Sequence, residues 1–278
     1  EEIKVSDNGS GIEYVQVALA FERFATSKLS EVQDLDSLET LGFRGEALPS
    51  IAAVSELTMI TKTESSNQAR RIYLKHGEVV EDGIFGSGIG TALTVRNLFE
   101  NFPGRLKFLR SRAGEATRVQ KVVSRYAMAY PGIRFRLSIE GREIINTLGS
   151  GELVEVVSNI YGLNVAHGMI KLPEDDTTDN TTLVTVSGMV GSASITRSNR
   201  NYINTFINGR WVQNKMLTYS VQEAYRGFLM ERRFPIAIIG LTIRPDQLDV
   251  NVHPSKIEVR FKHEGQVFSV LQQSIKSA

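Results

Sequence analysis

A turn bracketed by two glycines lies near the start of the chain: Gly42-Phe43-Arg44-Gly45-Glu46-Ala47-Leu48. The residues that follow it predict a helix over 46–54. A helix that opens straight after such a turn presents free backbone N–H groups and the positive end of its dipole, and both suit phosphate oxygens. The same pattern is also typical of a simple helix start. The turn therefore predicts either a phosphate site or an ordinary N-terminal turn.

Upstream of this turn lies Asp7-Asn8-Gly9-Ser10-Gly11, between a predicted strand end and a predicted helix over 12–23. Glycines let the backbone approach a ligand closely, and a carboxylate at this place can accept a hydrogen bond from an exocyclic amine such as that of adenine. The run is equally compatible with plain turn chemistry.

Two further features concern nucleotide binding. Thr91 follows Gly90 at the start of a predicted strand over 91–96, where its hydroxyl could lie near an adenine or simply belong to the strand. The G-x-x-x-x-G-K-[ST] motif is absent from the sequence, which excludes the common P-loop route to ATP.

Near the other end of the chain, residues 249–261 read Asp-Val-Asn-Val-His-Pro-Ser-Lys-Ile-Glu-Val-Arg-Phe. Lys256 follows a proline-containing turn and precedes a short predicted strand. From such a turn a lysine can reach a terminal phosphate as a point charge, or form a surface salt bridge.

The composition excludes several classes of protein. The chain has 278 residues, 41% of them hydrophobic, with 32 Lys+Arg against 31 Asp+Glu and no Cys. These values are those of a globular protein and exclude a disulfide scaffold, a cysteine–zinc site and thiol catalysis. The apolar runs are too short to span a bilayer, so we expect no membrane association. The His residues show no metal-ligand spacing, and we expect no metal site.

Strands and helices alternate along the chain, which predicts an α+β fold in two domains. A cluster of Gly and Ser at residues 147–151 places the boundary between residues 148 and 149, giving domains 1–148 and 149–278. An amphipathic helix is predicted over 115–130, and a further helix over 213–229.

Nine basic residues lie between residues 101 and 136, opposed only by Glu115. Such a block is typical of a phosphate-binding surface or of a solvated helix face paired with acids elsewhere. Its members are Arg105, Lys107, Arg110, Arg112, Arg118, Lys121, Arg125, Arg134 and Arg136.

Taken in order, these motifs resemble the MutL family of DNA mismatch repair proteins, which belongs to the GHKL ATPase superfamily. The resemblance covers essentially the whole chain and is most specific in its two longest motifs. The motifs that carry it are Asp7–Ile12, Phe24–Lys28, Leu41–Leu48, Gly90-Thr91, Phe99-x-Asn101-x-Pro103, Lys107–Leu109, Asn208-Gly209-Arg210 and Asp249–Phe261.

The resemblance implies a Bergerat-type α/β sandwich ATPase domain followed by a domain like that of ribosomal protein S5. It implies that Asp7 recognises the adenine amino group, that Gly9 and Gly11 shape that pocket, and that Thr91 lies near it. It further implies two phosphate-binding segments. These are the lid residues Thr26, Ser27 and Lys28, and the turn residues Phe43, Arg44, Gly45 and Leu48.

For the second domain, the resemblance implies that Lys256 touches the terminal phosphate of ATP. It also implies that a basic groove holds DNA without sequence preference, and Arg210 and Lys215 lie near a DNA-contacting position of the family. The implied partners are ATP with Mg²⁺, DNA, a second copy or a paralogue, a mismatch-recognition protein and downstream repair factors. The implied location is the cytoplasm or nucleoid of a bacterium, or the nucleus of a eukaryote.

One departure from the family concerns catalysis. The family's general base (Glu) and Mg²⁺ ligand (Asn) lie on a helix before the Asp-x-Gly motif, whereas only six residues, none of them Asn, precede Asp7 here. We therefore expect the true N-terminus to lie upstream, and this chain to bind ATP weakly or not at all and to hydrolyse it negligibly. The competing functions are a gyrase-B-like topoisomerase ATPase domain and a binding module without hydrolysis.

Overall fold

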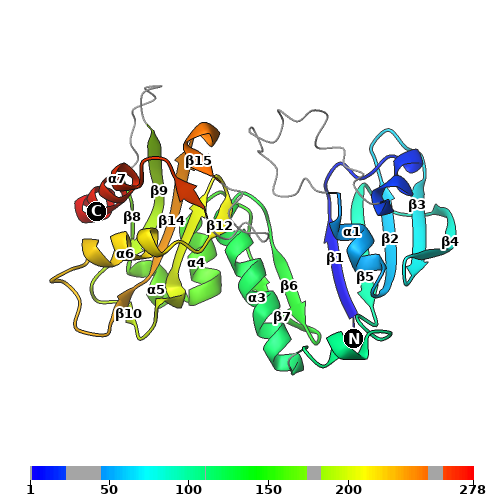
Figure 1. Ribbon diagram of the computed structural model, residues 1–278, viewed down its shortest axis with the longest axis horizontal. Coiled ribbons are helices and arrows are strands. Elements are labelled where there is room, and N and C mark those ends of the chain that lie inside the picture. The colour runs from blue at the N-terminus through cyan, green and yellow to red at the C-terminus, as the bar shows by residue number, and fades with distance from the viewer. Residues whose placement is uncertain (1, 23–44, 110, 174–182, 250–258) are drawn as a thin grey trace. The chain divides into compact units, whose positions relative to one another are not determined.

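The computed structural model describes residues 2–22, 45–109, 111–173, 183–249 and 259–278. The chain divides into two compact units, Glu1–Ser111 and Arg112–Ala278, and each is described by itself (Figure 1).

The first unit is built on one antiparallel sheet with the strand order β1-β5-β2-β3-β4. In β2 the side chains alternate between buried and half-buried positions, as expected for a strand with one face on the core. The described elements of this unit are β1 (Glu2–Asp7), η1 (Tyr14–Gln16), η2 (Leu19–Phe21), α1 (Ala47–Ala52), β2 (Glu56–Lys62), β3 (Ala69–Lys75), β4 (Glu78–Phe85), β5 (Gly90–Arg96) and α2 (Pro103–Leu106).

The core of the first unit lies between the sheet and the short helices η1, η2 and α1. Val17 from the η1–η2 segment and Ala52 from α1 pack against sheet residues such as Leu57 and Ile72. The helix predicted over 12–23 is therefore wrong in type: up to residue 22 the chain forms two single 3₁₀ turns instead. The N–H of Ile12 is bound to the sheet at Thr61, so the chain is held close to the sheet just before η1.

The second unit contains a five-stranded sheet with the order β12-β11-β14-β9-β8, in which only the β11–β14 pair is parallel among the described strands. Its elements are α3 (Arg112–Ala129), β6 (Arg136–Ile139), β7 (Arg142–Asn146), α4 (Leu153–Tyr161), α5 (Leu163–His167), β8 (Met169–Lys171), β9 (Val184–Gly191), β10 (Thr196–Arg197), η4 (Arg200–Tyr202), β11 (Ile203–Ile207), β12 (Arg210–Val212), α6 (Lys215–Ala224), β13 (Phe234–Pro235), β14 (Ala237–Ile243), η5 (Pro245–Gln247), β15 (Leu248–Asp249), β16 (Arg260–Phe261) and α7 (Glu264–Ser277).

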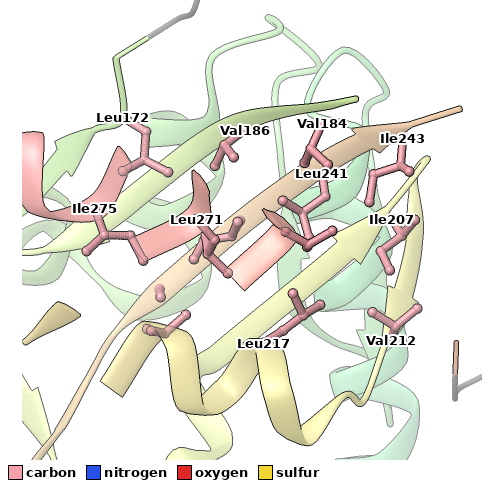
Figure 2. Packing of buried hydrophobic residues seen from close by; sticks show 14 of the residues in the cluster. Leu172, Val184, Val186, Ile207, Val212, Leu217, Leu241, Ile243, Leu271 and Ile275 are labelled. Carbon is pink, nitrogen blue, oxygen red and sulfur yellow. The ribbon is translucent and has the colours of Figure 1, made fainter. Parts of the chain in front are cut away.

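Helices cover both faces of this sheet, and β14 shows why. Its residues Ala237, Ile239, Leu241 and Ile243 join one core with α6 and α7, where Leu217 and Leu271 pack between helix and sheet (Figure 2). Ile236 and Ile238 face the opposite core, which α3, α4 and α5 complete. A strand buried on both faces is continuously apolar, as the run Ile236–Ile239 is.

The division between the compact units falls at Ser111/Arg112, before the boundary predicted between residues 148 and 149. The α3 helix accounts for the difference, because its residues Ala127 and Met128 are buried in a core of the second unit. Arg125 of α3 also stacks on Trp211, with its Cζ 3.3 Å from the ring centroid.

Candidate functional site

Asp7 ends β1 and pairs with Thr91 at the start of β5. Its Oδ1 accepts hydrogen bonds from the backbone N–H of Gly9 at 2.9 Å and of Thr91 at 3.3 Å. These two donors thus meet the same oxygen of this exposed carboxylate. The arrangement fixes the carboxylate and leaves Oδ2 suited to accept from an exocyclic amine.

Two glycines allow this close packing. Gly90 has φ +114°, and a Cβ there would lie 2.1 Å from the backbone oxygen of Asp7. Gly11 has φ +72°, and a Cβ there would lie 2.1 Å from the backbone oxygen of Lys62. Both distances are far inside van der Waals contact, so each position requires glycine.

Thr61 of β2 is a central residue of this region that the sequence reasoning missed. Its Oγ1 accepts the Ile12 N–H at 2.9 Å, lies 3.0 Å from Thr91 Oγ1 and donates to the Gly90 carbonyl at 3.2 Å. A hydroxyl has one proton and two lone pairs, so Thr91 is the donor in the hydroxyl pair. Thr61 thereby joins the Asp7–Gly11 turn to the Gly90–Thr91 pair. The sequence did contain a signal. Thr61 follows Leu57 and Met59 at alternate positions, so it lies on the same buried face of β2.

An open depression lies beside the same turn. The hydroxyl of Ser65 donates to Glu13 Oε1 at 2.7 Å and lies 3.0 Å from Thr63 Oγ1. The depression is lined by Ser10, Gly11, Ile12, Glu13, Gln16, Thr63, Glu64 and Ser65. Its wall is therefore rich in hydroxyl and carboxylate groups.

The predicted phosphate-binding residues are described only in part. Gly45 has φ +61°, and α1 begins two residues later. Leu48 packs against the core of the first unit, so its side chain anchors the helix start. The predicted site residues Thr26, Ser27, Lys28, Phe43, Arg44 and Lys256 lie outside the described residues.

Arg210 and Lys215 lie in the second unit, on and just after a hairpin. Arg210 starts β12 after the turn Asn208-Gly209, whose φ values of 48° and 76° both lie in the left-handed region. Burial lowers the pKa of the half-buried Arg210 guanidinium, while the neighbouring Tyr130 raises it. Lys215 is exposed at the first position of α6. The dipole of the helix disfavours a cation there, so an anionic ligand would compensate.

The basic block does not form one described surface, because the division between the units passes through it. Several of its members have partners within the second unit. Arg136 pairs with Glu143 at 2.6 Å and Arg118 with Glu115 at 3.4 Å. Arg125 stacks on Trp211, and burial lowers its pKa. The pairing with nearby acids that the sequence left open is thus present for part of the block.

Neither a cluster of metal-ligating side chains nor a membrane-spanning helix occurs among the described residues. They contain no group of three or more His, Cys, Asp or Glu side chains able to hold a metal ion. Nor does any helix in the ranges described have the length and apolar character needed to cross a membrane.

Comparison with known sequences gives consistent relatives. A family model described as "DNA mismatch repair protein, C-terminal domain" matches residues 157–278. The DNA mismatch repair proteins MutL of Streptococcus sanguinis and Clostridium acetobutylicum are 40% and 42% identical to the chain over 276 and 269 residues. These alignments cover 99% and 97% of this chain, which spans 42% of the length of each relative.

Comparison with solved structures confirms the predicted GHKL-type fold. The N-terminal domain of a DNA repair protein aligns with TM-score 0.80 and 25% identity, over 100% of this chain and 84% of that one. The Aquifex aeolicus MutL ATPase domain complexed with ADP aligns with TM-score 0.65 and 22% identity, over 100% and 85%. The B-subunit of DNA gyrase from Myxococcus xanthus aligns with TM-score 0.58 and 14% identity, over 99% and 80%, and shows the shared fold alone.

Proposed function

The chain belongs to the MutL family of DNA mismatch repair proteins, and we propose that it forms the nucleotide- and DNA-binding part of an ATP-dependent molecular switch. The switch binds ATP in the first domain, dimerises in response and holds DNA without sequence preference. It thereby couples mismatch recognition to downstream repair factors.

The geometry of Asp7 carries this proposal. Two backbone N–H groups, 84 residues apart in the chain, hold one oxygen of an exposed carboxylate. We assign the other oxygen to the amino group of adenine, with Gly9, Gly11 and Thr91 forming the surrounding wall. The buried Thr61 hydroxyl supports this wall, because it binds both the Gly11–Ile12 backbone and Thr91.

The phosphates of the nucleotide are assigned to the residues that the family motifs indicate. In the first domain these are Thr26, Ser27, Lys28, Phe43, Arg44, Gly45 and Leu48. The positive φ of Gly45 and the anchoring of Leu48 in the core support a fixed turn at the start of α1. Lys256 is assigned to the terminal phosphate, so that ATP and ADP are distinguished by this lysine.

DNA binding is assigned to Arg210 and Lys215. Contacts of lysine and arginine with phosphates give affinity without sequence preference and with strong salt dependence. The exposed position of Lys215 at a helix start, which the helix dipole disfavours, supports a role with an anionic partner.

The full-length protein is proposed to hydrolyse ATP with Mg²⁺, and to assemble with a second copy or a paralogue, a mismatch-recognition protein and repair factors. It would act where the chromosome lies, in the nucleoid or the nucleus. ATP turnover by the full-length protein distinguishes this proposal from a binding-only function, for which purified protein would show no turnover above background.

The adenine assignment is tested by Asp7→Asn in the full-length protein. Inosine triphosphate carries a carbonyl where ATP carries the amine, so a carboxylate at Asp7 favours ATP. We expect Asp7→Asn to weaken ATP binding by about tenfold or more, the equivalent of a charged hydrogen bond, and to remove the preference for ATP over inosine triphosphate. Glu78→Gln, an exposed change in β4, is the control. A variant that keeps the full preference would contradict the assignment.

A further inference from the structure

An asparagine followed by a glycine occurs at two places in the chain, Asn8-Gly9 and Asn208-Gly209. At such a pair the backbone nitrogen of the glycine can attack the side-chain amide of the asparagine, because glycine has no side chain to hinder the approach. A cyclic imide forms and ammonia leaves. Water then opens the ring to aspartate, or to isoaspartate, in which the backbone runs through the side-chain carbon. The sequence does not distinguish the two pairs, but the structure does.

Asn208 is held by its side chain in the second unit. Its Nδ2 donates to the Ile243 carbonyl at 2.8 Å, and its Oδ1 accepts the Ile243 N–H at 2.9 Å. The following Gly209 lies against Tyr130, whose hydroxyl a Cβ at that position would strike. Both hydrogen bonds must break before the Asn208 amide can turn toward the Gly209 nitrogen. This pair is therefore protected from the reaction.

Asn8 is exposed, and it lacks this support. In the ranges that the structure describes, no hydrogen bond holds its side-chain amide. Its neighbour Gly9 is also exposed. The amide of Asn8 is therefore free to turn toward the Gly9 nitrogen.

The Asp7 carboxylate supplies a base for the same reaction. The Gly9 N–H, which is the attacking group, donates to Asp7 Oδ1 at 2.9 Å. A carboxylate within hydrogen-bond reach of a reacting N–H can accept its proton as a general base. The Gly9 nitrogen then bonds to Cγ of Asn8, and its proton passes through Asp7 to Nδ2. The Cγ–Nδ2 bond breaks and releases ammonia, and one water is consumed when the ring opens.

The product does not fit the surroundings of Asn8. Isoaspartate adds the side-chain methylene to the backbone between Asp7 and Gly9. The backbone is already packed closely on β5 here, because a Cβ at Gly90 would lie 2.9 Å from the Asn8 Cα. A longer backbone separates Asp7 from the Thr91 N–H, which now donates to it at 3.3 Å. Aspartate and isoaspartate both add a negative charge beside Asp7, which repels an anionic nucleotide.

We propose that Asn8 is a site of spontaneous deamidation with the Asp7 carboxylate as the base, and that this modification inactivates the adenine site. The chemical step rests on the geometry around Asn8. The consequence rests on the proposed function, because it takes Asp7 as the residue that binds adenine. A nucleotide bound at Asp7 holds the turn and excludes water from it, so an empty site is modified faster than an occupied one.

The first experiment measures the rate of modification. The full-length protein is incubated at neutral pH and digested, and the deamidated fraction at each asparagine is followed by peptide mass spectrometry. We expect Asn8 to react faster than Asn208 by about tenfold or more, since only Asn208 must first break two hydrogen bonds. A saturating non-hydrolysable ATP analogue should slow the reaction at Asn8 and leave Asn208 unchanged.

Asp7→Asn tests the base, because it retains the exposed Asn8-Gly9 pair and removes the carboxylate. We expect the reaction at Asn8 to slow by about tenfold or more in this variant. An unchanged rate would overturn the assignment of Asp7 as the base.

The second experiment measures the consequence. Wild-type protein incubated in the same way should lose nucleotide binding in proportion to the fraction modified at Asn8. Asn8→Gln is the matched control, because glutamine keeps the amide but would have to close a larger ring. This variant should bind nucleotide when fresh and keep its affinity through the incubation.

The outcomes separate the inference from the function. If Asn8 reacts no faster than Asn208, the inference is wrong and the proposed function is unaffected. If Asn8 reacts faster but fresh protein binds no nucleotide, the proposed function fails and the modification site stands. If protein fully modified at Asn8 retains its affinity for nucleotide, the inferred inactivation is wrong.

Discussion

The backbone N–H of Thr91 donates to Oδ1 of Asp7 at 3.3 Å, across the pairing of β1 with β5. The contact joins the two motifs that the sequence indicated for the adenine site, and it makes the carboxylate depend on the pairing of the two strands. Changes that disturb this pairing should therefore impair nucleotide binding without touching the carboxylate.

Gly90→Ala tests the close packing of β1 on β5. The added Cβ would lie 2.1 Å from the Asp7 backbone oxygen, at a φ of +114° that alanine adopts with strain. We expect a loss of more than about 2 kcal/mol of unfolding free energy and of ATP binding, measured by denaturant titration and calorimetry. Gly83→Ala is the control, since nothing lies within 4 Å of its Cβ. Equal stability of the two variants would refute the argument.

Thr61→Val tests the buried hydroxyl beneath the turn. Valine has nearly the shape of threonine but leaves the Ile12 N–H, the Gly90 carbonyl and the Thr91 hydroxyl without this partner. We expect a cost of about 1–3 kcal/mol in stability, together with weaker ATP binding. Thr94→Val, a half-buried change on β5, should cost less than about 0.5 kcal/mol. The idea is abandoned if Thr61→Val binds ATP as well as the Thr94 variant.

Asp82 gives a pH-dependent prediction in the first unit. The hydrogen bond from Arg70 holds the pKa of the Asp82 carboxyl below its ordinary value of 3.8, and the Arg70 Nε lies 2.7 Å from Asp82 Oδ1. A lowered pKa stabilises the fold above the ordinary pKa, and this contribution is lost as the pH falls through the folded value. Asp82→Asn should therefore cost about 1 kcal/mol at pH 7 and progressively less in acid. Denaturant titrations across the acid range measure the difference.

The control for that titration is Glu81→Gln. Glu81 pairs with Arg71 at 2.7 Å, but both side chains are more exposed than those of the Arg70–Asp82 pair. We expect its effect to stay below about 0.5 kcal/mol. If the unfolding free energies of Asp82→Asn and the wild type differed by the same amount at all pH values, the lowered pKa of Asp82 would not be the cause of the difference.

Lys215→Ala tests the DNA assignment. Removing one phosphate contact should weaken binding to all sequences equally and reduce the slope of log affinity against log salt by about 1. Because the α6 dipole disfavours Lys215, the variant should not lose stability. Lys276→Ala, an exposed change at the end of α7, should leave the slope unchanged. Identical slopes for the two variants would remove Lys215 from the DNA surface.

The sequence predicted some strands and the longest helix well, where the periodicity is strong. The strand predicted over 91–96 is β5, and the helix predicted over 115–130 is α3. The helix over 12–23 was wrong, because its apolar residues also suit short turns that press Val17 into the core. Periodicity does not distinguish a continuous helix from such turns.

Motifs predicted Asp7 and Thr91 as site residues, and the structure brings these two residues into contact. Thr61 could not be read from a motif, since its role comes from the register of β2 beside β5, where Thr61 lies opposite Thr91. The roles of such residues are set by tertiary contacts.

The stacking of Arg125 on Trp211 has a practical consequence. Trp211 is the only tryptophan in the chain, and it lies in the second unit beneath a guanidinium group. Intrinsic fluorescence excited at the indole therefore reports on that unit alone, while far-ultraviolet circular dichroism reports on both. If the two signals change at different denaturant concentrations, the two units unfold separately. If they change together, the two units unfold in one transition.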